Sequence, residues 1–199
     1  MNFADVKLIY VFVCVVLGMI ILSPTLLSVV SFPEGEQFSE LYILDSNRKL
    51  ENIPFNVSAN APYTIHLGVG NEMGALESYL VYVKLRNQTD SLPDCATGSP
   101  SSLAPIYEYR LFLGDDEVWE REITFSFENV VIEGKINRIS GFSINGDLVD
   151  VEKVTVWDSE KDGFLYQLVF ELWIYNETTS VFEFHNRYVG LKLNITGSL

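Results

Sequence analysis

The segment richest in chemistry-bearing side chains is Asp158-Ser159-Glu160-Lys161-Asp162-Gly163, where carboxylates alternate before a glycine. Oxygen ligands at the first, third and fifth positions of such a loop can converge on one Ca²⁺ ion, which makes Asp158, Glu160 and Asp162 a calcium candidate. The glutamate that closes a calcium loop is missing, because the twelfth position is Val169, and Lys161 opposes a cation. An ordinary acidic turn is therefore the simpler interpretation, and we expect no metal or other cofactor.

Neither histidine lies in a catalytic or zinc-binding pattern. His66 and His185 fall within predicted strands, outside any His-Glu-x-x-His or paired-cysteine context. The sequence has no Gly-x-Ser-x-Gly elbow, no phosphate-binding Gly-Lys-Ser/Thr loop and no dinucleotide fingerprint. Because no catalytic nucleophile, base or metal cluster can be nominated, we expect a protein that is not an enzyme.

Four sequons of the form Asn-x-Ser/Thr, none with proline in the middle, predict N-linked glycans on an exported domain. Their acceptor residues are Asn56, Asn87, Asn176 and Asn194.

An uncharged apolar run from Leu8 to Phe32 precedes all four sequons. A helix of this length can cross a hydrocarbon core of about 30 Å, so we expect a transmembrane helix over residues 8–32. A cleaved signal peptide is the alternative, but signal cores run about 7–15 residues. Lys7 before the span and acidic residues after it place residues 1–7 in the cytoplasm and residues 33–199 outside a cell membrane. Within the span, Cys14 and Gly18 form a small-xxx-small pair that allows another helix to approach closely, or that simply faces lipid.

Composition limits the partners of the outer part. The formal net charge of −14 repels nucleic acid, so we exclude nucleic-acid binding. The predicted membrane boundary separates Cys14 from Cys95, so the two cysteines are not expected to form an internal disulfide. An apolar core must then hold the outer part, which is long enough for one domain.

Alternating apolar residues predict an all-β ectodomain, an immunoglobulin-like β-sandwich preceded by the one transmembrane helix. Residues 88–105, rich in Ser, Pro, Asp and Gly, are expected to form a long surface loop. Residues 129–162 are poorly periodic and predict a short helix or an irregular crossover. The expected strands are Phe38–Leu44, Tyr63–Val69, Tyr79–Leu85, Tyr107–Leu113, Ile123–Phe127, Val154–Trp157, Tyr166–Tyr175 and Val181–Ile195.

The apolar side chains that are expected to face the core change phase within the last expected strand. They pass from even positions, Phe182 and Phe184, to odd positions, Val189 and Leu191. A slip by one residue requires a β-bulge, which we place at residues 185–187. The polar residues 176–180 predict the hairpin turn before this strand.

The segments Phe38–Leu44, Tyr63–Asn71, Tyr79–Thr89 and Tyr166–Thr196, the last with Phe184-His185-Asn186-Arg187-Tyr188-Val189, resemble a family of archaeal membrane proteins. That family is known only as a domain of unknown function. The resemblance implies an archaeal envelope protein with an outer domain of this kind, in a family partly associated with surface glycosylation. It implies no active-site residue.

These features favour a non-enzymatic accessory subunit, whose span docks beside helices of other membrane protein subunits in the lipid bilayer. A pilin-like filament subunit is one alternative, although the sequence has no basic processing site before the apolar run. A glycan-binding or glycosylation accessory protein is the other, because Trp119, Trp157 and Trp173 offer stacking faces.

Overall fold

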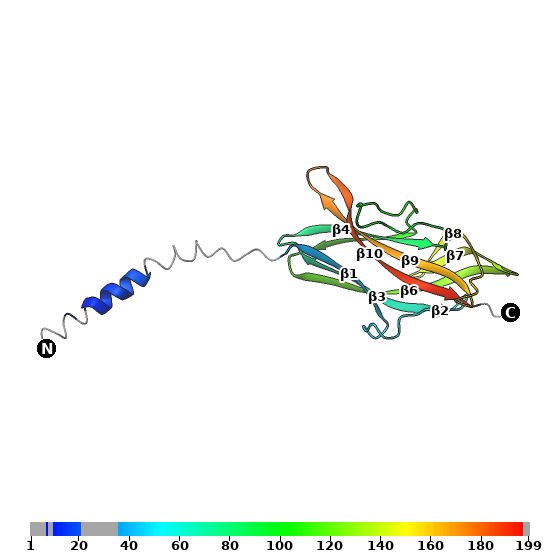
Figure 1. Cartoon of the computed structure of the whole chain (residues 1–199), viewed down its shortest axis with the longest axis horizontal. Helices are drawn as coiled ribbons and strands as arrows, with labels where there is room; N and C mark the ends of the chain where they lie inside the picture. Colours follow the sequence, from blue (N-terminus) through cyan, green and yellow to red (C-terminus); the bar gives the residue numbers. More distant parts are fainter. Residues whose placement is uncertain (1–6, 8–9, 21–35, 197–199) are drawn as a thin grey trace. The chain divides into compact units, whose positions relative to one another are not determined.

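The computed structural model describes Lys7, residues 10–20 and residues 36–196, which belong to two compact units divided after Gln37 (Figure 1). In the first unit, Lys7 and residues 10–20 are helical. No helix within the described residues is both long and apolar enough to cross a membrane. Residues 8, 9 and 21–32 of the predicted span lie outside the described residues, as do residues 1–6.

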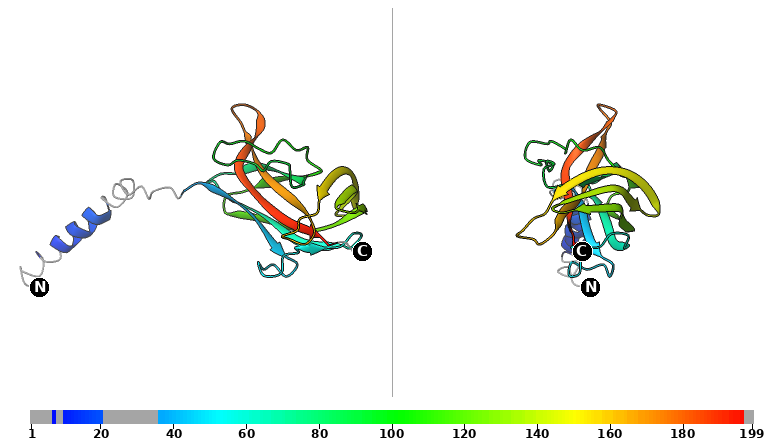
Figure 2. Two further views of the ribbon diagram at one scale, coloured as in Figure 1. Left: turned by 45° about the vertical axis from the view of Figure 1, so that its right-hand side comes forward. Right: turned by 90° about the vertical axis from the view of Figure 1, so that its right-hand side faces the viewer.

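The second unit consists of two five-stranded sheets packed face to face (Figures 1 and 2). Sheet I has the order β1-β3-β6-β7-β8, and sheet II has the order β2-β10-β9-β4-β5. The short β2 pairs parallel with β10. The strands are β1 (Phe38–Asp45), β2 (Asn56–Val57), β3 (Tyr63–Glu72), β4 (Glu77–Arg86), β5 (Tyr107–Leu113), β6 (Glu117–Glu133), β7 (Ile136–Ile144), β8 (Asp147–Val156), β9 (Phe164–Asn176) and β10 (Val181–Ile195).

This arrangement confirms the predicted β-sandwich. In sheet II, the order β10-β9-β4-β5 corresponds to strands G, F, C and C′ of an immunoglobulin variable domain. Sheet I differs in detail, because β6, β7 and β8 follow one another as a meander after the β1-β3 pair.

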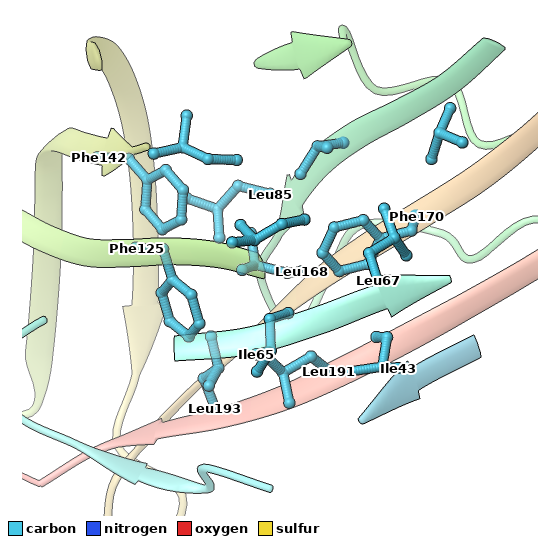
Figure 3. Packing of buried hydrophobic residues seen from close by; sticks show 14 of the residues in the cluster. Ile43, Ile65, Leu67, Leu85, Phe125, Phe142, Leu168, Phe170, Leu191 and Leu193 are labelled. Carbon is cyan, nitrogen blue, oxygen red and sulfur yellow. The ribbon is translucent and has the colours of Figure 1, made fainter. Parts of the chain in front are cut away.

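The core lies between the sheets and takes its side chains from alternate strand positions. Phe170 and Leu168 of β9 face residues of sheet I such as Leu67 and Phe125, and all four are almost fully buried (Figure 3). Stacked and edge-on ring pairs add geometric specificity, among them Phe125–Phe142 and Phe127–Phe142.

The bulge and the hairpin turn occur where the sequence predicts them. The β9–β10 register shifts between Phe184 and Arg187, and Asn186 adopts a positive φ of 54°. The Ser180 amide donates to the Asn176 carbonyl to close the turn, and the β9–β10 hairpin projects beyond the sheets (Figures 1 and 2).

The expectation for residues 129–162 was wrong. They contain the end of β6, all of β7 and β8, and the turn that follows β8, with no helix. A bulge between Ile139 and Gly141 shifts the buried positions of β7 by one residue, which hides the period of two. Asn145-Gly146, with φ of 54° and 89°, forms the tight β7–β8 turn, and an Asn-Gly pair is a strong hairpin signal.

Candidate functional site

The outer face of sheet II buries charged and amide side chains, which is unusual for the exterior of a sandwich. Because successive strand residues point to opposite faces, β4 directs Lys84 and Arg86 outward while Val83 and Leu85 enter the core. The long loop, residues 87–106, lies against this face and connects β4 to β5, as predicted (Figures 1 and 2).

A buried ion pair holds the loop to the sheet, and we call it the clasp. Lys84 Nζ lies 2.7 Å from Glu171 Oε2, and their side chains are only 4% and 0% exposed. Lys84 also donates to the Ser101 carbonyl at 3.0 Å, and the Ser101 amide donates to Glu171 Oε1 at 2.9 Å. Trp173 Nε1 donates to Glu171 Oε2, the oxygen that also faces Lys84, at 3.3 Å.

The clasp is a structural element, because both oxygens of Glu171 already accept hydrogen bonds. A charge can be buried only where it is paired and hydrogen-bonded, and here the loop backbone supplies the missing partners. The ion pair therefore fixes the middle of the loop over β4 and β9.

The start of the loop is fixed by a second group of contacts. Arg86 donates to the Asp90 carbonyl and, at 3.2 Å, to Gln167 Oε1. Asp90 accepts from Lys153 Nζ at 2.7 Å and from the Asn87 amide at 3.0 Å. Burial acts to raise the pKa of Asp90, but these hydrogen bonds and nearby cations hold that pKa below its usual value.

A pocket of about 260 Å³ opens beside this corner, and we call it the basic pocket. Arg86, Gln167 and Lys192 form one cross-strand row on β4, β9 and β10, and Lys161 comes from the β8–β9 turn. The lining contains three cationic side chains and no carboxylate. Its full lining is Phe55, Arg86, Asn87, Gln88, Lys161, Leu165, Tyr166, Gln167 and Lys192.

Asn194 of β10 holds two walls of the basic pocket. Its side-chain Nδ2 donates to Asn56 Oδ1 at 3.1 Å and to the Lys161 carbonyl at 3.2 Å. Its backbone amide donates to the Phe55 carbonyl at 2.7 Å. Gly163 makes room for this side chain, because a Cβ there would lie 1.9 Å from Asn194 Oδ1.

The four sequon asparagines differ in accessibility. Asn56 is exposed, whereas Asn194 is only 2% exposed and its Nδ2, the atom that would carry a glycan, is hydrogen-bonded inside the protein. Asn87 lines the basic pocket and donates to the Val154 carbonyl at 2.9 Å. Asn176 lies at the start of the β9–β10 turn and donates to Glu183 at 3.0 Å. Glycosylation therefore remains a prediction for Asn56, Asn87 and Asn176, and the folded domain disfavours it at Asn194.

A second polar cluster contains a serine–histidine contact. Ser39 Oγ lies 3.0 Å from His185 Nε2 and 2.7 Å from the Tyr79 hydroxyl, which donates to Asn71 Oδ1 at 3.0 Å. Ser39, Tyr79 and Asn71 are each 0% exposed, so the serine has no access to a substrate. The cluster links the edge strand β1 of sheet I to the β10 bulge of sheet II.

The histidine in this cluster predicts an acid-sensitive stability. Burial, aided by the Arg187 charge, lowers the pKa of His185. Between that lowered pKa and the unfolded value of about 6.5, the unfolded chain binds more protons, so stability falls as the pH is lowered through this window. We expect His185→Gln to weaken this dependence, measured by urea unfolding from pH 5 to 7.5. An unchanged pH dependence would contradict the assignment to His185.

The acidic turn does not assemble a set of metal ligands. Asp158 Oδ1 accepts from the Glu160 and Lys161 amides at 2.9 and 3.1 Å, and a backbone bridge joins Asp158 to Gly163. Nowhere in the described part of the chain do three or more His, Cys, Asp or Glu side chains gather so that they could hold a metal ion. In this arrangement the Asp158 carboxylate caps its own turn.

Cys14 and Gly18, the predicted helix contact, lie on the helix of residues 10–20. Cys14 is exposed, and nothing among the described residues lies within 4 Å of where a Cβ on Gly18 would be. Cys95 is also a free, exposed thiol, in the loop over sheet II.

The clasp and the basic pocket are not among the sites that the sequence predicted. One usable signal was present, because Lys84 and Glu171 are each flanked by apolar residues within their strands. Such residues are rarely buried unless paired. Nothing in the sequence, however, indicates that Arg86, Lys161 and Lys192 converge.

Comparison with solved structures gives distant likenesses, and the three described below have TM-scores under 0.5. A β-glucosidase from Listeria innocua is 10% identical over 81% of this chain, with a TM-score of 0.40, and the chain spans 16% of its length. A chain in the human seminal-plasma complex of zinc 2-glycoprotein and prolactin inducible protein is 12% identical, covering 82% of this chain and 98% of that one, with a TM-score of 0.39. The CARDB domain of a Pyrococcus furiosus protein, crystallised with di-metal ions, is 11% identical over 80% of this chain and 89% of that one, with a TM-score of 0.38. These likenesses carry no argument about function.

Comparison at the level of sequence identifies a family. None of the curated proteins matches the chain. The family model for a domain of unknown function, DUF1616, matches residues 33–140, which is more than half of the sequence. The protein therefore belongs to the DUF1616 family.

Proposed function

We propose that the protein is a non-enzymatic, membrane-anchored interaction subunit of an archaeal cell-envelope or membrane protein complex. Its amino end lies in the cytoplasm and its sandwich lies outside the cell membrane. The observation that carries the proposal is the apolar surface of the helix at residues 10–20.

This helix is apolar on every side. Tyr10 and Phe12 are each 70% exposed, and Met19 is 67% exposed. A helix that is hydrophobic all round is stable only where lipid or protein covers it. Together with the apolar run from Leu8 to Phe32, this supports a bilayer as the cover, with room for helices of partner subunits beside Cys14 and Gly18.

The sandwich supports a binding role better than a catalytic one. Its serine–histidine contact is buried, and the clasp engages both of its charged groups within the fold. A rigid sheet that carries an immobilised loop is a common way to present a binding surface.

The tryptophans give no specific support to the glycan-binding alternative. Each packs against another ring within the domain, which is the behaviour of structural aromatics. The pairs are Trp119–Tyr109, Trp157–Phe164 and Trp173–Tyr82.

We expect acidic substitutions on this helix to release the protein from membranes. Val13→Asp combined with Leu17→Asp places two charges one turn apart in the span, and each costs about 3 kcal/mol at a bilayer centre. The measurement is the fraction of full-length protein that stays with membranes after an alkaline carbonate wash. The matched control, Val13→Ala with Leu17→Ala, should remain in the membrane. Full retention of the double aspartate variant would contradict the anchor.

The interaction role is tested by extracting native membranes in a mild detergent, followed by size separation and mass spectrometry. Membrane proteins that co-migrate with the chain at a fixed ratio are the expected result. A lone monomer would contradict an accessory role, and a sedimenting polymer would favour the pilin-like alternative. Adding Cys14→Leu and Gly18→Leu to the control with two alanines tests whether the helix contributes to assembly.

A further inference from the structure

We propose that the basic pocket binds a small anionic ligand, a sugar or similar polyol that carries a carboxylate, phosphate or sulfate group. The inference does not depend on membrane anchoring, because every residue that carries it belongs to the sandwich.

The basic pocket gathers positive charge on an acidic chain. The chain has a formal net charge of −14, yet three of its 13 Lys and Arg residues line this one pocket and no Asp or Glu lines it. The neighbouring carboxylate, Asp90, is already paired with Lys153 at 2.7 Å. Within the described residues, the Lys161 and Lys192 ammonium groups have neither an ion-pair nor a hydrogen-bond partner. Clustered like charges destabilise a fold, so their convergence is explained best by an anion that neutralises them.

The shape and lining of the basic pocket suit a single sugar ring. About 260 Å³ suits a ligand the size of one sugar ring, because typical drug-sized pockets begin near 300 Å³. Phe55 and Leu165 supply apolar surface, on which a sugar ring can lie. Gln167 also lines the pocket beside the cations, and its side-chain NH₂ group is a donor suited to a hydroxyl group.

The walls of the basic pocket are held in place by hydrogen bonds within the domain. Gln167 holds Arg86, and Asn194 holds the backbone of both Phe55 and Lys161. The Lys161 amide also donates to Asp158 Oδ1 at 3.1 Å. Walls that are fixed before binding reduce the entropy lost when a ligand enters.

The test is titration calorimetry on the full chain in detergent, with glucose 6-phosphate, glucuronate and neutral glucose as probes. We expect both anions to bind, glucose to bind at least about tenfold more weakly, and affinity to fall as salt is added. The proposal would be overturned if neither anion binds measurably, or if glucose binds as tightly as the anions.

Variants assign the binding to this pocket. Lys161→Gln combined with Lys192→Gln should weaken anion binding by about tenfold or more. The control, Lys49→Gln combined with Lys135→Gln, changes two exposed lysines outside the pocket and should leave binding unchanged. An equal loss in both double variants would show a non-specific charge effect and overturn the assignment. The carbonate wash is independent of these titrations, so failure of the anchor and failure of the pocket are distinguishable.

The acidic sugar can be a free solute or part of a glycan attached to this chain, because the Asn56 sequon follows Phe55 and Asn87 lines the pocket. Titrating glycosylated and unglycosylated chains separates the two sources. Equal binding to both chains supports a free solute. Binding only to the unglycosylated chain supports an attached glycan that already occupies the pocket.

Discussion

Replacing Lys84 with methionine is expected to lower the free energy of unfolding by about 3–5 kcal/mol. The substitution leaves the Glu171 carboxylate 0% exposed without its cation, and the Ser101 carbonyl loses its donor. A stranded buried charge is among the most destabilising changes in a protein interior. Urea unfolding of the full chain in detergent, followed by tryptophan fluorescence, measures the loss.

Two further variants separate the clasp from a general effect of charge removal. Arg110→Met breaks the ion pair between Arg110 and Glu108, whose side chains are 62% and 44% exposed. This change should lower the free energy of unfolding by less than about 1 kcal/mol. Adding Glu171→Gln to Lys84→Met removes the stranded charge and should recover much of the stability. Hydrogen exchange should accelerate in residues 87–106 of the Lys84 variant. Similar losses for Lys84→Met and Arg110→Met would contradict the role of the clasp.

Replacing Asn194 with glutamine is expected to cost about 2–4 kcal/mol while leaving the number of attached glycans unchanged. The longer side chain has no space beside Gly163 and breaks the hydrogen bonds to Asn56 and Lys161. Urea unfolding measures the stability, and mass spectrometry of the intact protein from its native membranes counts the glycans.

Asn176→Gln is the matched control for this experiment, since it also removes a sequon. Asn176 lies in an exposed turn and caps the Thr178 amide at 2.8 Å, so its loss should cost less than about 1 kcal/mol. The glycan count should fall by one if Asn176 is occupied. A glycan found on Asn194 of the folded protein would contradict its structural role.

Strand positions could be predicted from the sequence, because β5 buries alternate residues and β4 and β9 are apolar at nearly every position. Tyr107–Leu113 and Val181–Ile195 match β5 and β10 residue for residue. The bulge at His185 and Asn186 could also be predicted, since a one-residue slip changes which side chains are apolar. The same reasoning failed for β7, because its own bulge breaks a pattern that is short and polar at several positions.

By itself, the sequence determined the all-β class, the long loop between β4 and β5 and the apolar character of residues 10–20. These properties follow from local periodicity and composition, which neighbouring residues share. Only the tertiary structure decided that Lys84 meets Glu171, that Arg86, Lys161 and Lys192 surround one pocket, and that the sequon residue Asn194 is buried. These contacts depend on strand order and register across separate segments of the chain, and a linear pattern does not encode which strands become neighbours.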